Sequence, residues 1–186
     1  MAAAFVGAVA LLTAFVVPGF AFPNVPPPPA PVSWPTAPTI EPLERTGEVT
    51  ALTQALPDSV FHLAQRGIEN YDQWQSENRA LESWAVLYAA SEDPGAASVA
   101  LTVGQWAEES AATSFAEAQM RAAGAPTRTG DVRVGTSVVG TFSIFNTGPG
   151  AGPGARTVIW WRNGTVVLRA EGPANLVTDF YTAFPL

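Results

Sequence analysis

Alternating apolar and polar residues predict two paired strands in the middle of the chain. Apolar side chains recur at every second position in residues 81–90 and again in residues 97–106, which places them on one face of a strand. Residues 91–95 between them read Ser-Glu-Asp-Pro-Gly, a turn sequence, because Pro fixes φ and Gly accepts positive φ. We therefore predict an antiparallel hairpin. The apolar faces consist of Trp84, Val86 and Tyr88 in the first strand and Val99, Leu101 and Val103 in the second.

A second hairpin is predicted nearer the C-terminal end. Residues 157–162 and 165–169 are rich in β-branched and aromatic side chains, and Asn163-Gly164 lies between them. Asn and Gly supply the two positive φ angles of a type I′ turn. Asn163-Gly164-Thr165 also fits the N-glycosylation pattern, but the tight turn already accounts for the Asn-Gly pair.

Glycines interrupt a further stretch with strand character. Residues 132–139 and 141–146 have this character, and we expect the strand to bend or break at Gly135 and Gly140. Residues 146–154 are rich in Gly, but they lack the P-loop Lys, contain prolines and lead into a strand. This segment is therefore predicted to be a hairpin loop and not a phosphate site.

Apolar residues spaced three and four apart predict two helices. Residues 107–123 are rich in Ala, Glu and Gln, and Gly124 is placed to end that helix. Glu108 and Glu109 fall in its first turn, where negative charge interacts favourably with the exposed amides. Pro173, at a first helical position, begins a short closing helix. The apolar faces are Ala111, Phe115, Ala118 and Ala122 in the first helix and Leu176, Val177, Phe180, Tyr181 and Phe184 in the second.

Residues 53–80 fit two patterns. Alternation over Val60–Gln65, after Leu56-Pro57, predicts a strand that enters the sheet, and we favour this interpretation over a helix. The competing helical face comprises Val60, Leu63, Ala64, Ile68, Tyr71 and Trp74. The order of elements predicts an α+β fold, an antiparallel β-sheet with two or three helices packed on it.

The first residues carry no charge from Ala2 to Phe22, about the length that a helix needs to cross a membrane. Residues 1–22 are therefore predicted to be a transmembrane or signal helix, with residues 2–22 in contact with the membrane. The apolar length favours an uncleaved anchor, although the basic residues that usually flank either kind of segment are missing. Gly19-Phe20-Ala21 fits the small-x-small pattern of a signal-peptide cleavage site. Cleavage near Ala21, followed by secretion, is therefore the alternative. Both interpretations predict an extracytoplasmic C-terminal domain, which for the anchor means a single-pass protein of the cytoplasmic membrane.

A proline-rich linker is predicted over residues 23–47, followed by the domain at 48–186. Nine prolines lie in residues 23–42, a composition that favours extended polyproline II. At about 3.1 Å per residue, such a linker holds a domain on the order of 60 Å from the bilayer. An SH3-type docking site is the competing interpretation, but such modules are not expected outside a cell.

Composition excludes several classes of function. The net charge is −7 and all nine basic residues are Arg, so no basic patch is expected and nucleic acid is not an expected partner. The chain has no Cys and a single His, which leaves no zinc site, thiolate or disulfide. We predict no cofactor and no metal site, with a calcium site built from carboxylates alone as the alternative that composition leaves open.

Adjacent tryptophans are the strongest candidate for a binding surface. Trp160 and Trp161 follow each other on one strand, so their rings point to opposite faces of the sheet. One ring is exposed unless helices cover both faces. Exposed Trp is enriched at interaction hot spots. Trp160, Trp161 and Arg162 are therefore the predicted binding residues, and full burial in a two-sided sandwich is the alternative.

His62 is the only candidate for a catalytic base. Asp58, Ser59 and Glu69 lie near it in sequence and are the candidates for the nucleophile and the orienting acid that such a base works with. The chain contains no G-x-S-x-G nucleophile elbow, so we predict no catalytic residues. A cell-envelope hydrolase or transferase using His62 and nearby carboxylates is the alternative function.

Several short segments carry a resemblance to a known group of proteins. They are Ala55-Leu56-Pro57, Ala85-Val86-Leu87-Tyr88, Thr102-Val103-Gly104-Gln105-Trp106, Trp161-Arg162-Asn163-Gly164-Thr165 and Glu171-Gly172-Pro173. Over residues 55–184 the chain resembles actinobacterial membrane-anchored extracytoplasmic α+β domains without an assigned activity, and its outline is similar to Mog1/PsbP-like domains. The resemblance implies a protein that binds or assists other proteins and is not an enzyme. We therefore expect a non-catalytic binding or scaffolding module for another envelope protein.

Overall fold

The computed structural model describes residues 36–45, 49–134, 136–147 and 155–186. The predicted membrane segment 1–22 and most of the predicted linker lie outside the described residues. Within the described residues, no helix has both the length and the apolar character needed to cross a membrane.

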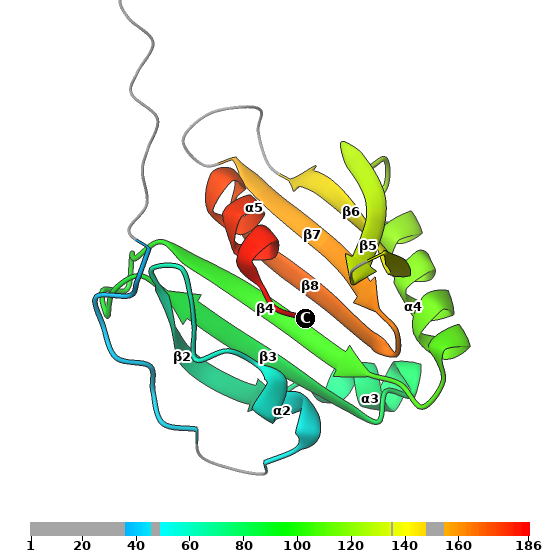
Figure 1. Ribbon diagram of the computed structural model, residues 1–186, viewed down its shortest axis with the longest axis horizontal. Coiled ribbons are helices and arrows are strands. Elements are labelled where there is room, and N and C mark those ends of the chain that lie inside the picture. Colours follow the sequence, from blue (N-terminus) through cyan, green and yellow to red (C-terminus); the bar gives the residue numbers. More distant parts are fainter. Residues whose placement is uncertain (1–35, 46–48, 135, 148–154) are drawn as a thin grey trace, which may run out of the picture. The chain divides into compact units, whose positions relative to one another are not determined.

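Eight strands form a single sheet in which every neighbouring pair is antiparallel (Figure 1). Their spatial order is β1-β2-β3-β4-β8-β7-β6-β5. The fold is therefore α+β with an antiparallel sheet, as the sequence predicts. The strands are β1 (Ser59–Val60), β2 (Leu63–Asn70), β3 (Glu82–Ala89), β4 (Ser98–Gln105), β5 (Arg128–Val134), β6 (Ser137–Thr147), β7 (Arg156–Asn163) and β8 (Val166–Pro173).

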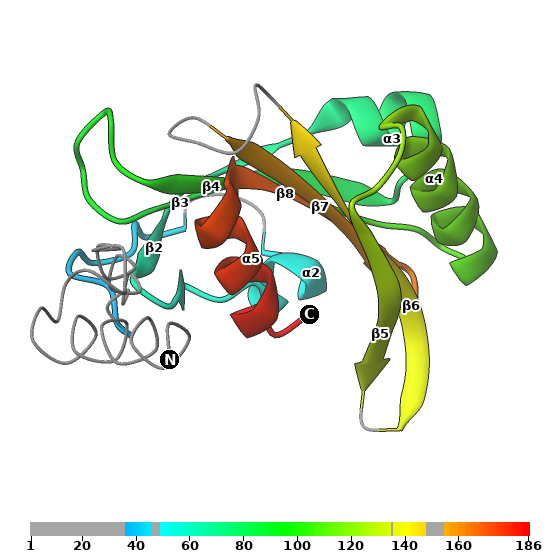
Figure 2. The ribbon, with the colours of Figure 1, turned by 90° about the horizontal axis from the view of Figure 1, so that it is seen from above.

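Four helices in the described part of the chain cover both faces of the sheet, where the sequence predicts two or three helices (Figure 2). They are α2 (Ala51–Ala55), α3 (Asp72–Asn78), α4 (Glu109–Ala122) and α5 (Ala174–Ala183). One buried cluster lies under α2 and α5 and includes Tyr88, Leu101, Trp161 and Phe180. A second lies under α3 and α4 and includes Trp74, Trp106, Phe115 and Trp160. The two clusters make a three-layer structure, with the sheet between two pairs of helices.

Both predicted hairpins are present, but one turn differs from the prediction. β3 pairs with β4, with Trp84 opposite Val103, and β7 pairs with β8. Asn163 pairs with Val166, so Gly164 and Thr165 are the central residues of the second turn. Of these two residues, only Gly164 has a positive φ, at 57°. The predicted type I′ turn is therefore wrong, because positive φ at the first central residue alone is the arrangement of type II′.

β5 and β6 form a hairpin where the sequence predicts a bent or broken strand. The predicted break near Gly135 corresponds to the reversal between Val134 and Ser137. β6 continues through Gly140, but its pairing with β5 is irregular there, with Val132 opposite Gly140 and Arg133 opposite Val138. A Cβ atom at Gly140 would overlap the backbone oxygen of Arg162 on β7. Gly140 therefore allows two backbones to approach closely and does not end a strand. The glycine-rich segment joins β6 to β7, which are antiparallel as a hairpin requires, although residues 148–154 lie outside the described residues.

The region 53–80 contains the favoured strand but with other limits. β2 begins at Leu63, and the competing helical interpretation, through Val60 and Trp74, is wrong because most of that stretch is extended. In the sequence, the short helix α2 precedes the β1–β2 pair and the short helix α3 follows it. Neither is long enough to show a clear helical period in the sequence.

The two longer helices are located as predicted, although α4 has a different buried face. Phe115 is buried together with Ala112 and Ala116, whereas Ala111 and Ala118 are exposed. The large ring of Phe115 packs between Trp74 and Trp106, and this contact sets the rotation of the helix. α5 buries Leu176, Val177 and Phe180 as predicted, Phe184 directly after it is also buried, and Tyr181 is only partly buried. Pro173 is its N-cap residue instead of its first helical residue.

Residues 36–45, part of the predicted linker, lie along the outer edge of β2. The amide of Leu43 donates to the Gln65 carbonyl at 2.9 Å, and Arg66 Nη1 donates to the Glu41 carbonyl at 2.6 Å. These bonds occupy backbone and side-chain groups of a strand edge that would otherwise be open to another chain.

Arg45 fastens this segment to the domain. Its guanidinium donates to the carbonyl oxygens of Thr53 and Leu56, to Gln65 Oε1 at 2.9 Å and to Asp58 Oδ1 at 2.6 Å. One planar group thereby connects the end of the linker, α2 and β2. A guanidinium suits such a site because its donors are held in a rigid fork.

Replacing Arg45 with alanine should lower the free energy of unfolding by about 2 kcal/mol, because several hydrogen bonds to a charged group are lost. Urea unfolding followed by tryptophan fluorescence measures the change. Arg45→Lys should recover less than half of the loss, since an ammonium cannot reach the same set of acceptors. Full recovery by Lys would show that charge alone accounts for the effect.

Candidate functional site

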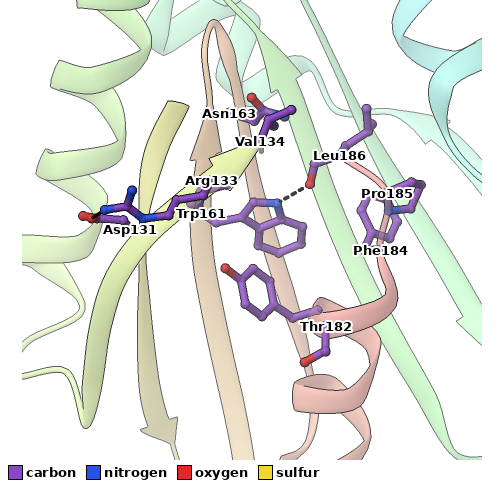
Figure 3. A pocket seen from close by; sticks show the side chains of 11 residues that line it. Asp131, Arg133, Val134, Trp161, Asn163, Thr182, Phe184, Pro185 and Leu186 are labelled. Carbon is purple, nitrogen blue, oxygen red and sulfur yellow. Dashed lines mark hydrogen bonds and ion pairs between the residues drawn. The ribbon is translucent and has the colours of Figure 1, made fainter. Parts of the chain in front are cut away.

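A groove of about 340 Å³ lies between β5 and the C-terminal end of α5 (Figure 3). β5 supplies one wall with Val132 and Val134, and the segment that follows α5 supplies the other. Trp161 of β7 forms the floor. The groove is lined by Asp131, Val132, Arg133, Val134, Trp161, Asn163, Tyr181, Thr182, Phe184, Pro185 and Leu186.

The groove exists because the β5–β6 hairpin curls toward the face of the sheet that carries α5 (Figure 2). Aromatic contacts hold the two sides together. Tyr181 lies 5.2 Å from Trp161 and 5.3 Å from Phe142 of β6, ring centre to ring centre. The indole N–H of Trp161 donates to the backbone oxygen of Leu186 at 3.0 Å, which attaches the last residues to the floor (Figure 3).

The wall formed by β5 combines an exposed apolar side chain with a pair of opposite charges. Val134 is 61% exposed. Arg133 and Asp131 form an ion pair at 2.8 Å, and both side chains are about half exposed. Alternation along the strand places this pair on the face of β5 opposite to Val132 and Val134, and Figure 3 shows it pointing away from Trp161, so it borders the groove and does not face into it.

Tyr181 adds a neutral hydroxyl to the opposite wall. Burial raises the pKa of Tyr181 above its ordinary value, against a smaller opposing effect of the Arg128 charge. The phenol therefore stays protonated at neutral pH and can donate or accept a hydrogen bond. Apolar walls and a neutral hydroxyl, with an ion pair at the outer edge of β5, suit an apolar side chain with adjacent polar groups, such as a peptide segment offers.

The structure places Trp160 and Trp161 on opposite faces, as predicted, but buries both. Trp161 is 1% exposed and Trp160 is 5% exposed. The expectation of an exposed ring is wrong, because α5 covers one face and α3 with α4 cover the other. Trp161 reaches the groove only as its floor, so contact with a ligand falls mainly to the wall residues.

Trp160 belongs to an aromatic cluster in the core. Its ring stacks on Trp74 at 5.8 Å with an interplanar angle of 21°, and Phe115 contacts it edge-on at 6.3 Å. The guanidinium of Arg169 lies 5.9 Å from its centre. These neighbours cover the ring. Trp160 therefore packs in the core and does not line the groove.

Arg162 connects structural elements and does not line the groove. Its Nη1 makes an ion pair with Glu109 at 2.7 Å, at the start of α4. The same nitrogen donates to the carbonyls of Gly164 and Val139 at 2.9 and 3.3 Å. Of the three predicted binding residues, only Trp161 therefore lies at the groove.

His62 lies in the two-residue turn between β1 and β2, where it is 5% exposed. Asp58 is ion-paired with Arg45, and Glu69 lies near the far end of β2, roughly 20 Å along an extended strand. The structure thus separates His62 from Glu69 and places Asp58 in another interaction. His62 does not line the groove.

Val134, Asp131, Arg133 and Tyr181 were not predicted as site residues. The signal that points to this wall is an apolar residue, Val134, directly before the glycine at which the strand is predicted to break. Within the described residues, no group of three or more His, Asp and Glu side chains is arranged to hold a metal ion.

The chain was compared with protein-family models, with curated protein sequences and with solved structures, and none matched. The resemblance to anchored extracytoplasmic domains therefore stays a prediction from the sequence.

Proposed function

We propose that this protein is a non-catalytic binding or scaffolding module that residues 1–22 hold at the outer face of the cytoplasmic membrane. Its partner is another envelope protein, and the groove between β5 and α5 is the contact. Tethering by the proline-rich segment would let the domain reach partners away from the bilayer.

One observation carries this proposal: the groove pairs an exposed apolar residue on a sheet edge with a polar rim. β5 is the last strand of the sheet, and its Val134 stands at the wall of the groove beside the Arg133–Asp131 pair. Protein interfaces commonly combine an apolar centre with a polar rim. A peptide segment with one apolar side chain would be held by the walls and oriented by the rim.

Replacing Val134 with glutamate should remove the partner without unfolding the domain. The side chain is largely exposed, so the change costs little stability but places a charge in the apolar wall. We expect co-purification of an envelope protein with the full chain, after mild crosslinking in native membranes, to fall at least tenfold. Quantitative mass spectrometry of the recovered partner measures this loss.

Val138→Glu is the matched control, because Val138 lies on the same hairpin, is similarly exposed and does not line the groove. It should leave the partner bound. Equal retention of the partner by both variants and wild type would place the contact elsewhere.

A further inference from the structure

A second pocket, of about 260 Å³, lies at β2 and β3, toward the edge of the sheet opposite to β5 and the groove. It is lined by Thr50, Asn70, Gln75, Leu81, Glu82 and Trp84. Thr50 is the N-cap residue of α2 and Gln75 belongs to α3. Helices from opposite faces of the sheet therefore contribute to one small site.

The polar side chains of this pocket hold one another in place. Glu82 Oε2 accepts hydrogen bonds from Thr50 Oγ1 at 2.6 Å and from the indole N–H of Trp84 at 2.8 Å. Gln75 Nε2 donates to Asn70 Oδ1 at 2.5 Å. Three planar polar groups and an indole are thus oriented before any ligand arrives, which reduces the entropy lost on binding.

Hydrogen-bonding capacity remains after these contacts. In the described part of the chain, Glu82 Oε1 and Gln75 Oε1 accept no hydrogen bond. Each of the two side-chain amides has two N–H groups and uses one of them, Gln75 toward Asn70 Oδ1 and Asn70 toward Asp72 Oδ1. The pocket therefore offers acceptors and a donor in close proximity. Adjacent hydroxyl groups of a ligand can both donate to the acceptors and accept from the amide.

The charge of the residues that line this pocket limits which ligands it can bind. The lining contains one carboxylate and no basic side chain, so a phosphate or carboxylate ligand would meet repulsion without a compensating cation. The indole of Trp84 adds a large apolar surface with one polar atom, which is already bonded to Glu82. A neutral ligand with hydroxyl groups on its rim and C–H groups on its face fits both features.

We propose that this pocket binds a neutral saccharide ring, with hydroxyls on Glu82, Gln75 and Asn70 and a C–H face against Trp84. The volume suits one ring, because it is below the range of pockets that enclose drug-sized ligands. The site is independent of the protein-binding groove. It would give an extracytoplasmic domain a contact with cell-envelope glycan in addition to its protein partner.

Nuclear magnetic resonance of the full chain tests the proposal through the indole N–H signals. The signal of Trp84 is identified by its disappearance in Trp84→Phe, and that of Trp161 in Trp161→Phe. Titration with glucose, N-acetylglucosamine and their β-1,4-linked disaccharides should shift the Trp84 signal saturably for at least one sugar. The Trp161 signal should not move, because its ring forms the floor of the other groove.

Gln75→Leu should weaken that sugar's binding at least tenfold, the effect expected when a hydrogen-bonding group is replaced by an apolar one of similar size. Gln73→Leu is the matched control, because Gln73 lies on the same helix, bonds Tyr71 and Glu77, and does not line the pocket. No saturable shift up to the solubility limit of every sugar would overturn the proposal. A shift with tetramethylammonium but not with sugars would also overturn it and assign a cation site, and so would unchanged affinity in Gln75→Leu.

Discussion

Replacing Trp161 with alanine should lower the free energy of unfolding by about 3–5 kcal/mol, the usual cost of removing a buried aromatic side chain. The ring contacts Tyr181 and Phe184 and bonds the backbone oxygen of Leu186. Its removal would leave a cavity under α5 and release the last residues from the groove floor. If Trp161→Ala loses partner binding, the loss would therefore reflect a destabilised domain and not a missing contact between Trp161 and the partner.

Urea unfolding monitored by circular dichroism measures this effect without depending on tryptophan emission. Leu87→Ala serves as the control, because Leu87 is an exposed apolar residue of β3. Its loss should stay below about 1 kcal/mol, as for most surface substitutions. A similarly small loss for Trp161→Ala would mean that α5 does not pack on the sheet as described.

Replacing Gly140 with alanine should destabilise the domain by about 3 kcal/mol, the upper part of the range for overpacking. The new Cβ would meet the backbone oxygen and carbon of Arg162, which belong to β7 and cannot rotate away as a side chain would. Either β6 must move away from β7, or the hairpin β5–β6 must shift as a whole. Both changes disturb the groove, because β5 forms one of its walls.

Gly67→Ala is the matched control for Gly140→Ala, since no atom outside the neighbouring residues of the chain lies within 4 Å of a Cβ at Gly67 in β2. The change should be neutral or stabilise the protein by up to about 1 kcal/mol, because it restricts the unfolded chain. Thermal unfolding of the two variants side by side checks the difference. Equal melting temperatures would show that β6 and β7 do not approach as closely as described.

Local sequence chemistry was enough to predict most of the strands and both longer helices. The hairpins at 82–105 and 156–173 follow from alternation and turn residues, which act within a few positions of the chain. Gly124 ends α4 with a φ of 93°, as a residue without a side chain can. Periodicity likewise predicted the buried residues of α5.

The errors concern features that depend on contacts between distant segments. The rotation of α4 follows from the fit of Phe115 between Trp74 and Trp106, two residues from other elements. Asn163 belongs to β7 because it pairs with Val166, and this register moved the turn by one residue. Neither contact leaves a periodic signal in the sequence.

By itself, the sequence determined that a net-acidic chain without Cys or Lys forms an antiparallel sheet with helices, because alternation, period and turn chemistry are local. Only the tertiary structure decided that helices cover both faces and bury Trp160 and Trp161 together. It also decided that Val134 and Tyr181 meet across a groove, and that Thr50, Gln75 and Trp84 share a pocket. The physical reason is that burial and convergence depend on which segments pack together, and packing joins residues far apart in the chain.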